Sequence, residues 1–256
     1  MEAPTTTSAR IRIRIRGLDH RMVDQSAGEI AAQAARTGAR VNGPLPLPSR
    51  VEVARAGGQD EIRGHHRLVE VIGANAQTIE VMRRLNLPSG VDITIVLPDQ
   101  PIAPDPNAVP AKRNRRHDNR VAAIQFLCAW ESQRHPDLVT ALYDFMNGRE
   151  QGRDYFSFAE ELIHGVIRDV TLVDVVVTKY ATNWAVGRIA RVDLAILRLA
   201  VFELMRRTDI PPIVSINEAV DIAKEFSTEE SRRFVNGILD SYMSELGRDP
   251  RKAEGG

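Results

Sequence analysis

Residues 9–17 read ARIRIRIRG, in which isoleucine and arginine alternate for three full periods. Strict alternation with a period of two predicts a strand that is buried on one face. Ile11, Ile13 and Ile15 then face a core. A solvated face that discourages edge pairing is the simpler interpretation of the other side, and a row of phosphate contacts is the alternative. That side carries Arg10, Arg12, Arg14 and Arg16.

The remainder of residues 10–97 alternates between strand and helix patterns. Helical patterns cover residues 22–37 and 75–86, and strand patterns cover 39–53, 61–72 and 90–97. The prolines of GPLPLP, residues 43–48, predict an edge position or a bend in the second strand. The glycine pair of RAGGQ, residues 55–59, predicts a tight reversal. The resulting βαββαβ order predicts a ferredoxin-like α+β domain, an antiparallel sheet with two helices.

A proline-rich segment separates this domain from a second kind of pattern. Residues 98–111 hold five prolines in 14 residues, which is typical of an extended, semi-rigid linker. Residues 112–247 then show only helical periods, which predict an all-α helical bundle. Within it, Ser215 and Glu218 predict a capping box, and a Ser or Thr at 227–228 predicts the start of the last helix. The tails 1–9 and 248–256 are expected to be disordered.

Composition narrows the classes of function. The 256 residues have a formal net charge of zero, so any nucleic-acid site must be a local basic patch. Cys128 is the only cysteine, which excludes an internal disulfide and fits a reducing cytoplasm. No apolar run approaches the ~20 residues that cross a membrane, and the first ten residues lack a signal-peptide core. His65 and His66 point to opposite faces of a strand, so we expect no metal and no other cofactor.

Long stretches on both sides of the linker resemble known families. IRIRIRGLDHRMVDQSAGEIAAQAARTGARVNGPLPLPSR (residues 11–50) and EIRGHHRLVEVIGANAQTIEVMRRLNLPSGVDITIVL (61–97) resemble the small-subunit ribosomal protein also called NusE. The chain resembles NusB in AAIQFLCAW (122–130), VDLAILRLAVFELMRRTDIPPIVSINEAVDIAKEF (192–226) and SRRFVNGILD (231–240). The two families are normally separate proteins that form a heterodimer, so the sequence predicts a NusE–NusB fusion.

The resemblance implies an RNA-binding transcription antitermination factor that catalyses no reaction. The NusB–NusE pair binds boxA, a single-stranded element of nascent RNA, in antitermination complexes that include those on ribosomal RNA operons. The implied protein partners are RNA polymerase, NusA and NusG. A ribosomal small-subunit protein with an appended rRNA-binding helical domain stays open as the alternative. The join from Pro48 to His65 is shorter than the ribosome-threading loop of NusE proteins, which puts ribosome binding in doubt.

An enzyme is the third class considered, because NusB-like domains also occur fused to RNA methyltransferases. No G-x-G-x-x-G follows a predicted strand, and no nucleophile–base pair is evident. The sequence therefore favours a binding protein over an enzyme.

Candidate RNA contacts fall in two places of the helical region. The segment KRNRRHDNR, residues 112–120, is a local basic patch at a position where the NusB family binds RNA. Phe234, the aromatic residue of SRRFVNG, matches a NusB phenylalanine that contacts RNA, and single-stranded bases stack on such rings. The alternatives are a solvated linker end and a core role for the aromatic. The candidates are Arg113, Arg115, Arg116, Arg120, Glu230, Arg232, Arg233 and Phe234.

The resemblance also implies two protein contacts. In the family, an acid at the position of Asp24 meets the first NusB helix, where Cys128 stands in place of the usual hydroxyl-bearing aromatic. The interface residues predicted for docking of the two domains within one chain are His20, Arg21, Asp24, Cys128 and Asp193. Candidate NusG contacts are Met82, Arg83 and Asp92, for which an ordinary helix end and strand start is the alternative.

Overall fold

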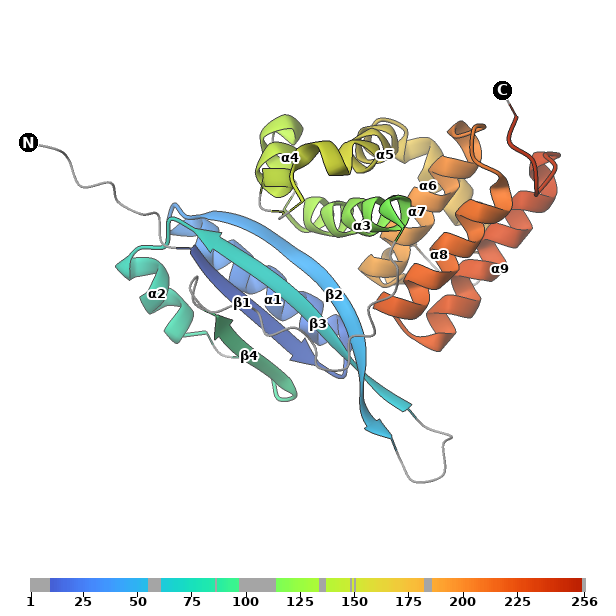
Figure 1. The fold of residues 1–256 in the computed structure, drawn as a ribbon. Helices are drawn as coiled ribbons and strands as arrows, with labels where there is room; N and C mark the ends of the chain where they lie inside the picture. Colours follow the sequence, from blue (N-terminus) through green and yellow to red (C-terminus); the bar gives the residue numbers. More distant parts are fainter. Residues whose placement is uncertain are drawn as a thin grey trace, which may run out of the picture. The chain divides into compact units, whose positions relative to one another are not determined.

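The computed structural model describes residues 10–54, 61–85, 87–96, 114–133, 137–147, 149, 151–181 and 186–254. The chain divides into two compact units, an N-terminal unit with a β-sheet and a C-terminal helical unit (Figure 1). Within the described part, no helix is both long and apolar enough to cross a membrane.

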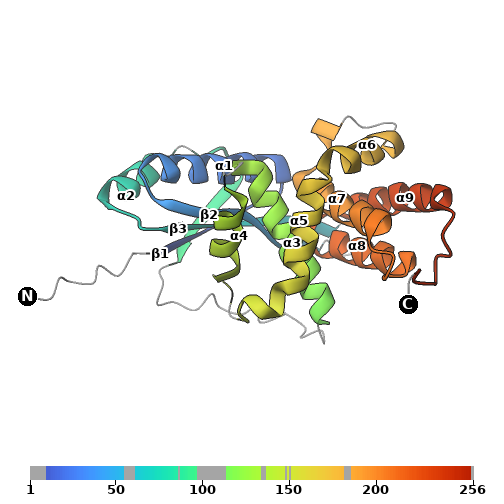
Figure 2. The same ribbon diagram turned by 90° about the horizontal axis from the view of Figure 1, so that it is seen from above.

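The N-terminal unit has the predicted βαββαβ order. Its elements are β1 (Arg10–Gly17), α1 (His20–Arg36), β2 (Arg40–Ala54), β3 (Glu61–Ile72), α2 (Ala76–Arg83) and β4 (Val91–Val96). All strand pairs are antiparallel, and the sheet order is β2-β3-β1-β4. This order is that of a split βαβ unit, in which β3 lies between β1 and β2. Helices α1 and α2 lie on one face of the sheet (Figure 2).

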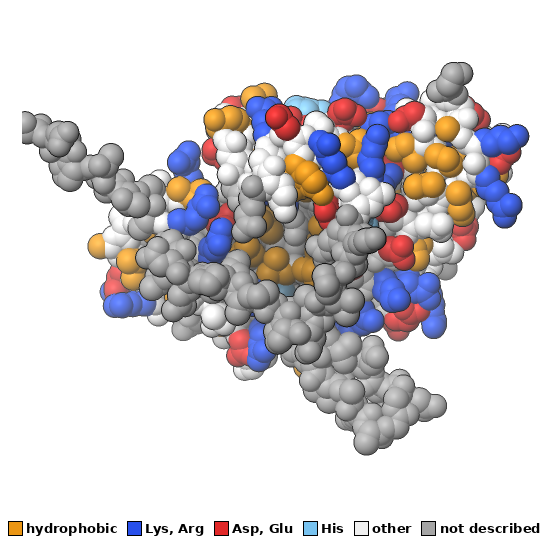
Figure 3. All heavy atoms as spheres, in the orientation of Figure 1, with side chains coloured by type: hydrophobic (Ala, Val, Ile, Leu, Met, Phe, Trp, Pro, Cys, Tyr) orange, Lys and Arg blue, Asp and Glu red, His pale blue; other side chains and the backbone are white. Residues whose placement is uncertain are grey.

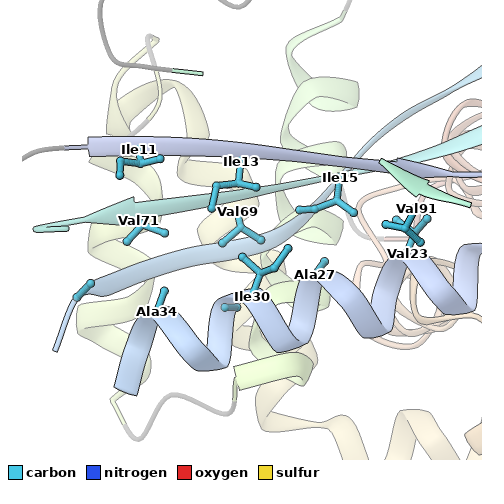
Figure 4. Packing of buried hydrophobic residues seen from close by; sticks show 12 residues of the cluster. Ile11, Ile13, Ile15, Val23, Ala27, Ile30, Ala34, Val69, Val71 and Val91 are labelled. Carbon is cyan, nitrogen blue, oxygen red and sulfur yellow. The ribbon is translucent and has the colours of Figure 1, made fainter. Parts of the chain in front are cut away.

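Packing of α1 against β1 forms the core of this unit (Figure 4). The side chains of Ile13 and Ile15 are at most 2% exposed and meet Ile30 from the helix. Asp19 caps α1 by accepting a hydrogen bond from the backbone N–H of Arg21 at 2.8 Å. The alternation of residues 10–16 is therefore confirmed as a strand with a buried isoleucine face.

Strand β2 is an edge strand and carries the irregularities that its prolines predict. Its register against β3 shifts between Asn42 and Leu45, where the Gly43–Pro44 peptide bond is cis. Gly43 has a φ of 107°, and a Cβ there would lie 2.5 Å from the carbonyl oxygen of Leu68, so only glycine fits. The two strands stay paired out to Ala54 and Glu61. The reversal predicted at residues 55–59 lies outside the described residues.

The helical unit contains seven α-helices within its described part. They are α3 (Arg115–Gln133), α4 (Leu138–Asn147), α5 (Ser157–Arg168), α6 (Val170–Tyr180), α7 (Arg191–Arg206), α8 (Pro212–Phe226) and α9 (Glu229–Leu246). Two short 3-10 helices, η1 (Arg153–Phe156) and η2 (Val186–Arg188), precede α5 and α7. The predicted all-α bundle is confirmed.

Helix α7 is the centre of the bundle and packs against α5, α6, α8 and α9. Nearly every α7 residue from Val192 to Leu204 is buried. Gly165 of α5 faces the ring of Phe202, and a Cβ at position 165 would lie 2.0 Å from the ring carbon Cζ. The absence of a side chain at Gly165 therefore lets α5 and α7 approach closely.

Helix α8 starts earlier than its capping-box pattern predicts. Pro212 occupies the first turn, so Ser215 lies inside the helix, and its hydroxyl donates to the carboxylate of Glu203 at 2.5 Å. Helix α9 is capped as predicted, because Thr228 Oγ1 accepts a hydrogen bond from the backbone N–H of Ser231.

The C-terminal segment, expected to be a disordered tail from residue 248, makes defined contacts in the structure. The Pro250 carbonyl accepts from the N–H of Ile213, and the Arg248 guanidinium donates to the Leu204 carbonyl at 2.9 Å. These contacts hold residues 248–250 against the ends of α7 and α8.

Candidate nucleic-acid interface

The first turn of α3 carries two of the predicted RNA-binding arginines. The guanidinium of Arg115 donates to the carbonyl oxygens of Asp154 and Tyr155 at 2.5 and 3.0 Å. The guanidinium carbon of Arg116 lies 4.0 Å from the centre of the Phe158 ring, within the range of a cation–π contact. Both residues keep exposed surface, so their charges are available to a polyanion. Arg113 lies outside the described residues.

Arg120 is a correction to the predicted RNA-binding set. It is 4% exposed, and its guanidinium donates two hydrogen bonds to the carboxylate of Glu203, at 2.8 and 3.0 Å. Glu203 is 1% exposed and also accepts from Ser215. Helical periodicity turns position 120 inward with Ile124 and Leu127, although it belongs to a basic run. Arg120 therefore neutralises a buried carboxylate and does not face a phosphate.

His117 ties the start of α3 to α8. Its Nδ1 lies 3.0 Å from the carboxylate of Glu218, and its Nε2 lies 3.6 Å from that of Glu225. Hydrogen bonds to these two carboxylates raise the pKa of His117 to about 9, so the imidazole is charged at neutral pH. The same His117 contact lowers the pKa of Glu218. Because Glu225 precedes the cap residue Thr228 by three positions, this network brings the first turn of α3 to the junction of α8 and α9.

The first two turns of α9 carry the other predicted RNA contacts. Arg232 pairs with Glu229 at 2.9 Å, and Arg233 is well exposed, 3.6 Å from the same carboxylate. Glu230 is exposed, and Phe234 is half-buried. Phe234 is thus neither fully buried nor fully exposed.

The α3 arginines rest on contacts that the local sequence pattern does not reveal. Guanidinium groups of Arg116, Arg120 and Arg207 all lie within 5.5 Å of the centre of the Phe158 ring. Asn119 is fully buried and accepts from the backbone N–H of Ala159 at 2.8 Å. The sequence holds no local signal for these contacts, because the partners are about 40 to 50 positions apart in the chain.

Figure 3 shows basic and acidic side chains intermixed on the visible face of the helical unit. Asp209, for example, pairs with Arg207 at 2.8 Å, which lowers the pKa of Asp209. This mixture of charges agrees with the zero net charge of the chain. A nucleic-acid site therefore depends on local arrangements such as the first turns of α3 and α9.

The interface residues predicted on α1 make contacts within the N-terminal unit. The Asp24 carboxylate accepts from Arg67 Nε at 2.6 Å, and the His20 ring lies edge-on to that of His65, 5.6 Å between centres. Burial, followed by the charge of Arg67, lowers the pKa of His65 to about 4, which keeps this ring neutral. Arg21 is exposed.

The interface residues predicted in the helical unit are likewise engaged within their own unit. The Cys128 thiol donates to the Arg191 carbonyl at 3.7 Å, and Asp193 accepts from the Ser231 hydroxyl at 2.6 Å. The Asp193 contact ties α7 to the first turn of α9. Asp193 thus supports the α9 turn that carries candidate RNA contacts.

The candidate NusG contacts differ in exposure. Met82 packs partly against the core of the N-terminal unit, whereas Arg83 is exposed. Asp92 is exposed and lies 3.3 Å from Arg16 across the strands. Among the described residues, no group of three His, Cys, Asp or Glu side chains is arranged to hold a metal ion.

Two family models match the chain. The model described as "NusB family" matches residues 117–244, and the model described as "Ribosomal protein S10p/S20e" matches residues 12–96. The first match covers the helical unit from the first turn of α3 to the last turns of α9. The second covers the sheet unit from β1 to β4.

Two curated relatives of the helical unit share one description. The "Transcription antitermination protein NusB" of Geobacter sulfurreducens is 42% identical over 134 residues, which cover 51% of this chain and 95% of that protein. The protein so described from Geotalea uraniireducens is 52% identical over 113 residues, covering 43% of this chain and 78% of that protein. A solved structure of T. maritima NusB is 34% identical, covers 53% of this chain and 94% of that chain, and gives a TM-score of 0.47.

Proposed function

The chain belongs to the NusB family and carries an S10-family domain ahead of it, and from this premise we propose that it is a transcription antitermination factor. In this proposal the helical unit binds the single-stranded boxA element of nascent RNA. The sheet unit links that RNA to the transcribing RNA polymerase, with NusA and NusG as further partners. Ribosomal RNA operons are the proposed targets, and the proposal assigns no reaction to the chain.

The observation that carries the RNA-binding proposal is the His117 network. By pairing with Glu218 and Glu225, His117 joins the first turn of α3 to the α8–α9 junction. Arginines then come from two helix starts, Arg115 and Arg116 from α3 and Arg232 and Arg233 from α9. Phosphates bind to such charges, and in this proposal a base stacks on the ring of the half-buried Phe234.

Fluorescence anisotropy with a short boxA RNA and a scrambled RNA, over a series of salt concentrations, tests this function. We expect tight binding to boxA alone. Phe234→Ala removes a stacking surface worth about 1–3 kcal/mol per base and should weaken boxA binding at least fivefold. Arg116→Ala should weaken binding and make its salt dependence shallower, because one phosphate contact is lost.

The matched control for Arg116→Ala is Arg36→Ala, which removes an exposed arginine at the end of α1. It should leave boxA affinity unchanged. Equal and weak binding of both RNAs would contradict the antitermination proposal. Co-sedimentation with small ribosomal subunits would then bring the ribosomal alternative to the front.

We further propose that the two units of one chain dock on each other through His20, Arg21, Asp24, Cys128 and Asp193. Support comes from the family resemblance and from the linker, which raises the effective concentration of the units to about millimolar. Cleavage within residues 98–111 tests this idea. We expect the two fragments to stay associated at micromolar concentration and to separate on dilution, and immediate separation would contradict the docking.

A further inference from the structure

A row of four arginines runs along β1 on the sheet face that points away from the helices. We call Arg10, Arg12, Arg14 and Arg16 the arginine row; each alternates with an isoleucine or glycine of the helix-covered face. Strand β1 is an inner strand, paired with β3 on one side and β4 on the other. Guarding an exposed strand edge therefore does not explain these arginines.

The strand register shows which charges share this face. Arg12 lies opposite Glu70, with its Nε 2.8 Å from the carboxylate. Arg16 lies opposite Asp92, with its Nε 3.3 Å from that carboxylate. Arg40 of β2 joins the same face, since it and Arg10 both lie opposite Ile72. Among the described register partners on this face, arginines thus outnumber carboxylates by five to two.

The spacing of the arginine row fits a linear polyanion. Alternate residues of a strand lie about 6.6–6.8 Å apart, so the row extends over about 20 Å at nearly even intervals. Phosphates of an extended single strand repeat at a similar distance, and guanidinium groups bind phosphate oxygens in pairs. A folded acidic protein matches this repeat only where acidic residues alternate along a strand, whereas every phosphate of an extended nucleic-acid strand follows it. The row therefore favours a nucleic-acid backbone as its ligand.

We propose that the arginine row binds the phosphate backbone of single-stranded RNA, independently of base sequence. No Phe, Tyr or Trp stands among the described register partners of the row, so the contact is electrostatic and lacks base stacking. The inference rests on the proposed RNA-binding function, to which it adds a second RNA surface on the sheet unit. That surface holds RNA that extends beyond the segment read by the helical unit.

The experiment measures binding of a long oligouridylate to the full chain over a series of salt concentrations. The test variant is Arg10→Gln with Arg14→Gln, because Arg12 and Arg16 stay to neutralise Glu70 and Asp92. Loss of two phosphate contacts should make the slope of log K against log salt shallower by about 1.4, at roughly 0.7 per contact. Arg10→Lys with Arg14→Lys keeps both charges and should restore the slope.

The matched control is Arg36→Gln with Arg84→Gln, which removes two exposed arginines at the C-terminal ends of α1 and α2. An unchanged slope in the test variant, or an equal loss in this control, would overturn the proposal. Weakened binding to polyglutamate with unchanged binding to RNA would assign the row to an acidic protein and would also overturn it. Thermal unfolding of each variant checks that the sheet unit stays folded.

The boxA comparison separates this inference from the proposed function. If boxA and scrambled RNA bind alike while the test variant still loses slope on oligouridylate, the arginine row stands and the antitermination proposal fails. If boxA is preferred but the slope on oligouridylate does not change, the antitermination proposal stands and the second surface is excluded.

Discussion

Arg120 and Glu203 form a buried ion pair with two hydrogen bonds, 83 positions apart in sequence. Glu203→Gln leaves the buried guanidinium without an opposite charge. We expect the free energy of unfolding to fall by about 3–5 kcal/mol, the range for removal of one partner from a buried pair. Urea unfolding followed by circular dichroism measures this loss.

The control for this prediction is Glu229→Gln, which breaks the exposed pair with Arg232. An exposed pair contributes about 0–1 kcal/mol, so this variant should unfold nearly as the parent does. Similar losses for Glu203→Gln and Glu229→Gln would show that Arg120 is not the buried partner described above.

His117 predicts a loss of stability on the alkaline side. Its pKa is about 9 in the folded chain, against an ordinary value of 6.5, so the folded state binds the proton more tightly. The stabilisation is fully present below about pH 6.5 and is lost as the pH rises through about 9. Each pKa difference of one corresponds to about 1.4 kcal/mol, so the total is at most a few kcal/mol.

The measurement is the urea midpoint of the parent and of His117→Gln between pH 6 and 10. The difference between the two should be largest at pH 6, should already decrease above about pH 6.5 and should nearly vanish at pH 10. The charged groups that surround His117 are Glu218 and Glu225, with Arg120 3.6 Å from Glu218. A difference that stays constant with pH would contradict the charged imidazole.

Local sequence pattern predicted the helices and strands better than it predicted which side chains contact one another. Alternation in residues 10–16 fixed the buried face of β1, because side-chain direction in a strand follows directly from position. Arg120 was misassigned because it stands in a basic run, and its partner Glu203 lies on another helix. Ser215 was misassigned as a helix cap, because its hydroxyl donates to Glu203 on another helix and α8 already starts at Pro212. The role of such a residue depends on a partner that lies far away in the chain, so the pattern of its sequence neighbours does not reveal it.

Gly165 predicts a strong steric effect in the bundle. In Gly165→Ala the new Cβ would lie 2.0 Å from Cζ of Phe202, so α5 and α7 must move apart. Overpacking of this kind costs about 1–3 kcal/mol. We expect thermal unfolding to show this loss, and Phe202→Leu in the same chain to recover part of it.

Gly237 of α9 supplies the opposite control. A Cβ there meets no atom within 4 Å, so Gly237→Ala should stabilise the helix by about 0.5–1 kcal/mol. If both alanine variants changed stability equally, close approach of α5 and α7 would not be the cause.

Thr228 connects helix stability to RNA binding. Its hydroxyl oxygen accepts from the N–H of Ser231 and caps α9, whose first turns carry Arg232, Arg233 and Phe234. Thr228→Ala should cost about 1 kcal/mol and loosen this first turn. Because the binding groups must then be ordered by the RNA, we expect boxA affinity to fall severalfold while the fold persists.

Fluorescence anisotropy measures the boxA affinity of Thr228→Ala, and hydrogen exchange at the Ser231 amide reports the loosening of the first turn of α9. Thr228→Ser keeps the cap and should bind as the parent does. Faster exchange at Ser231 with unchanged affinity would show that the first turn of α9 does not contact RNA.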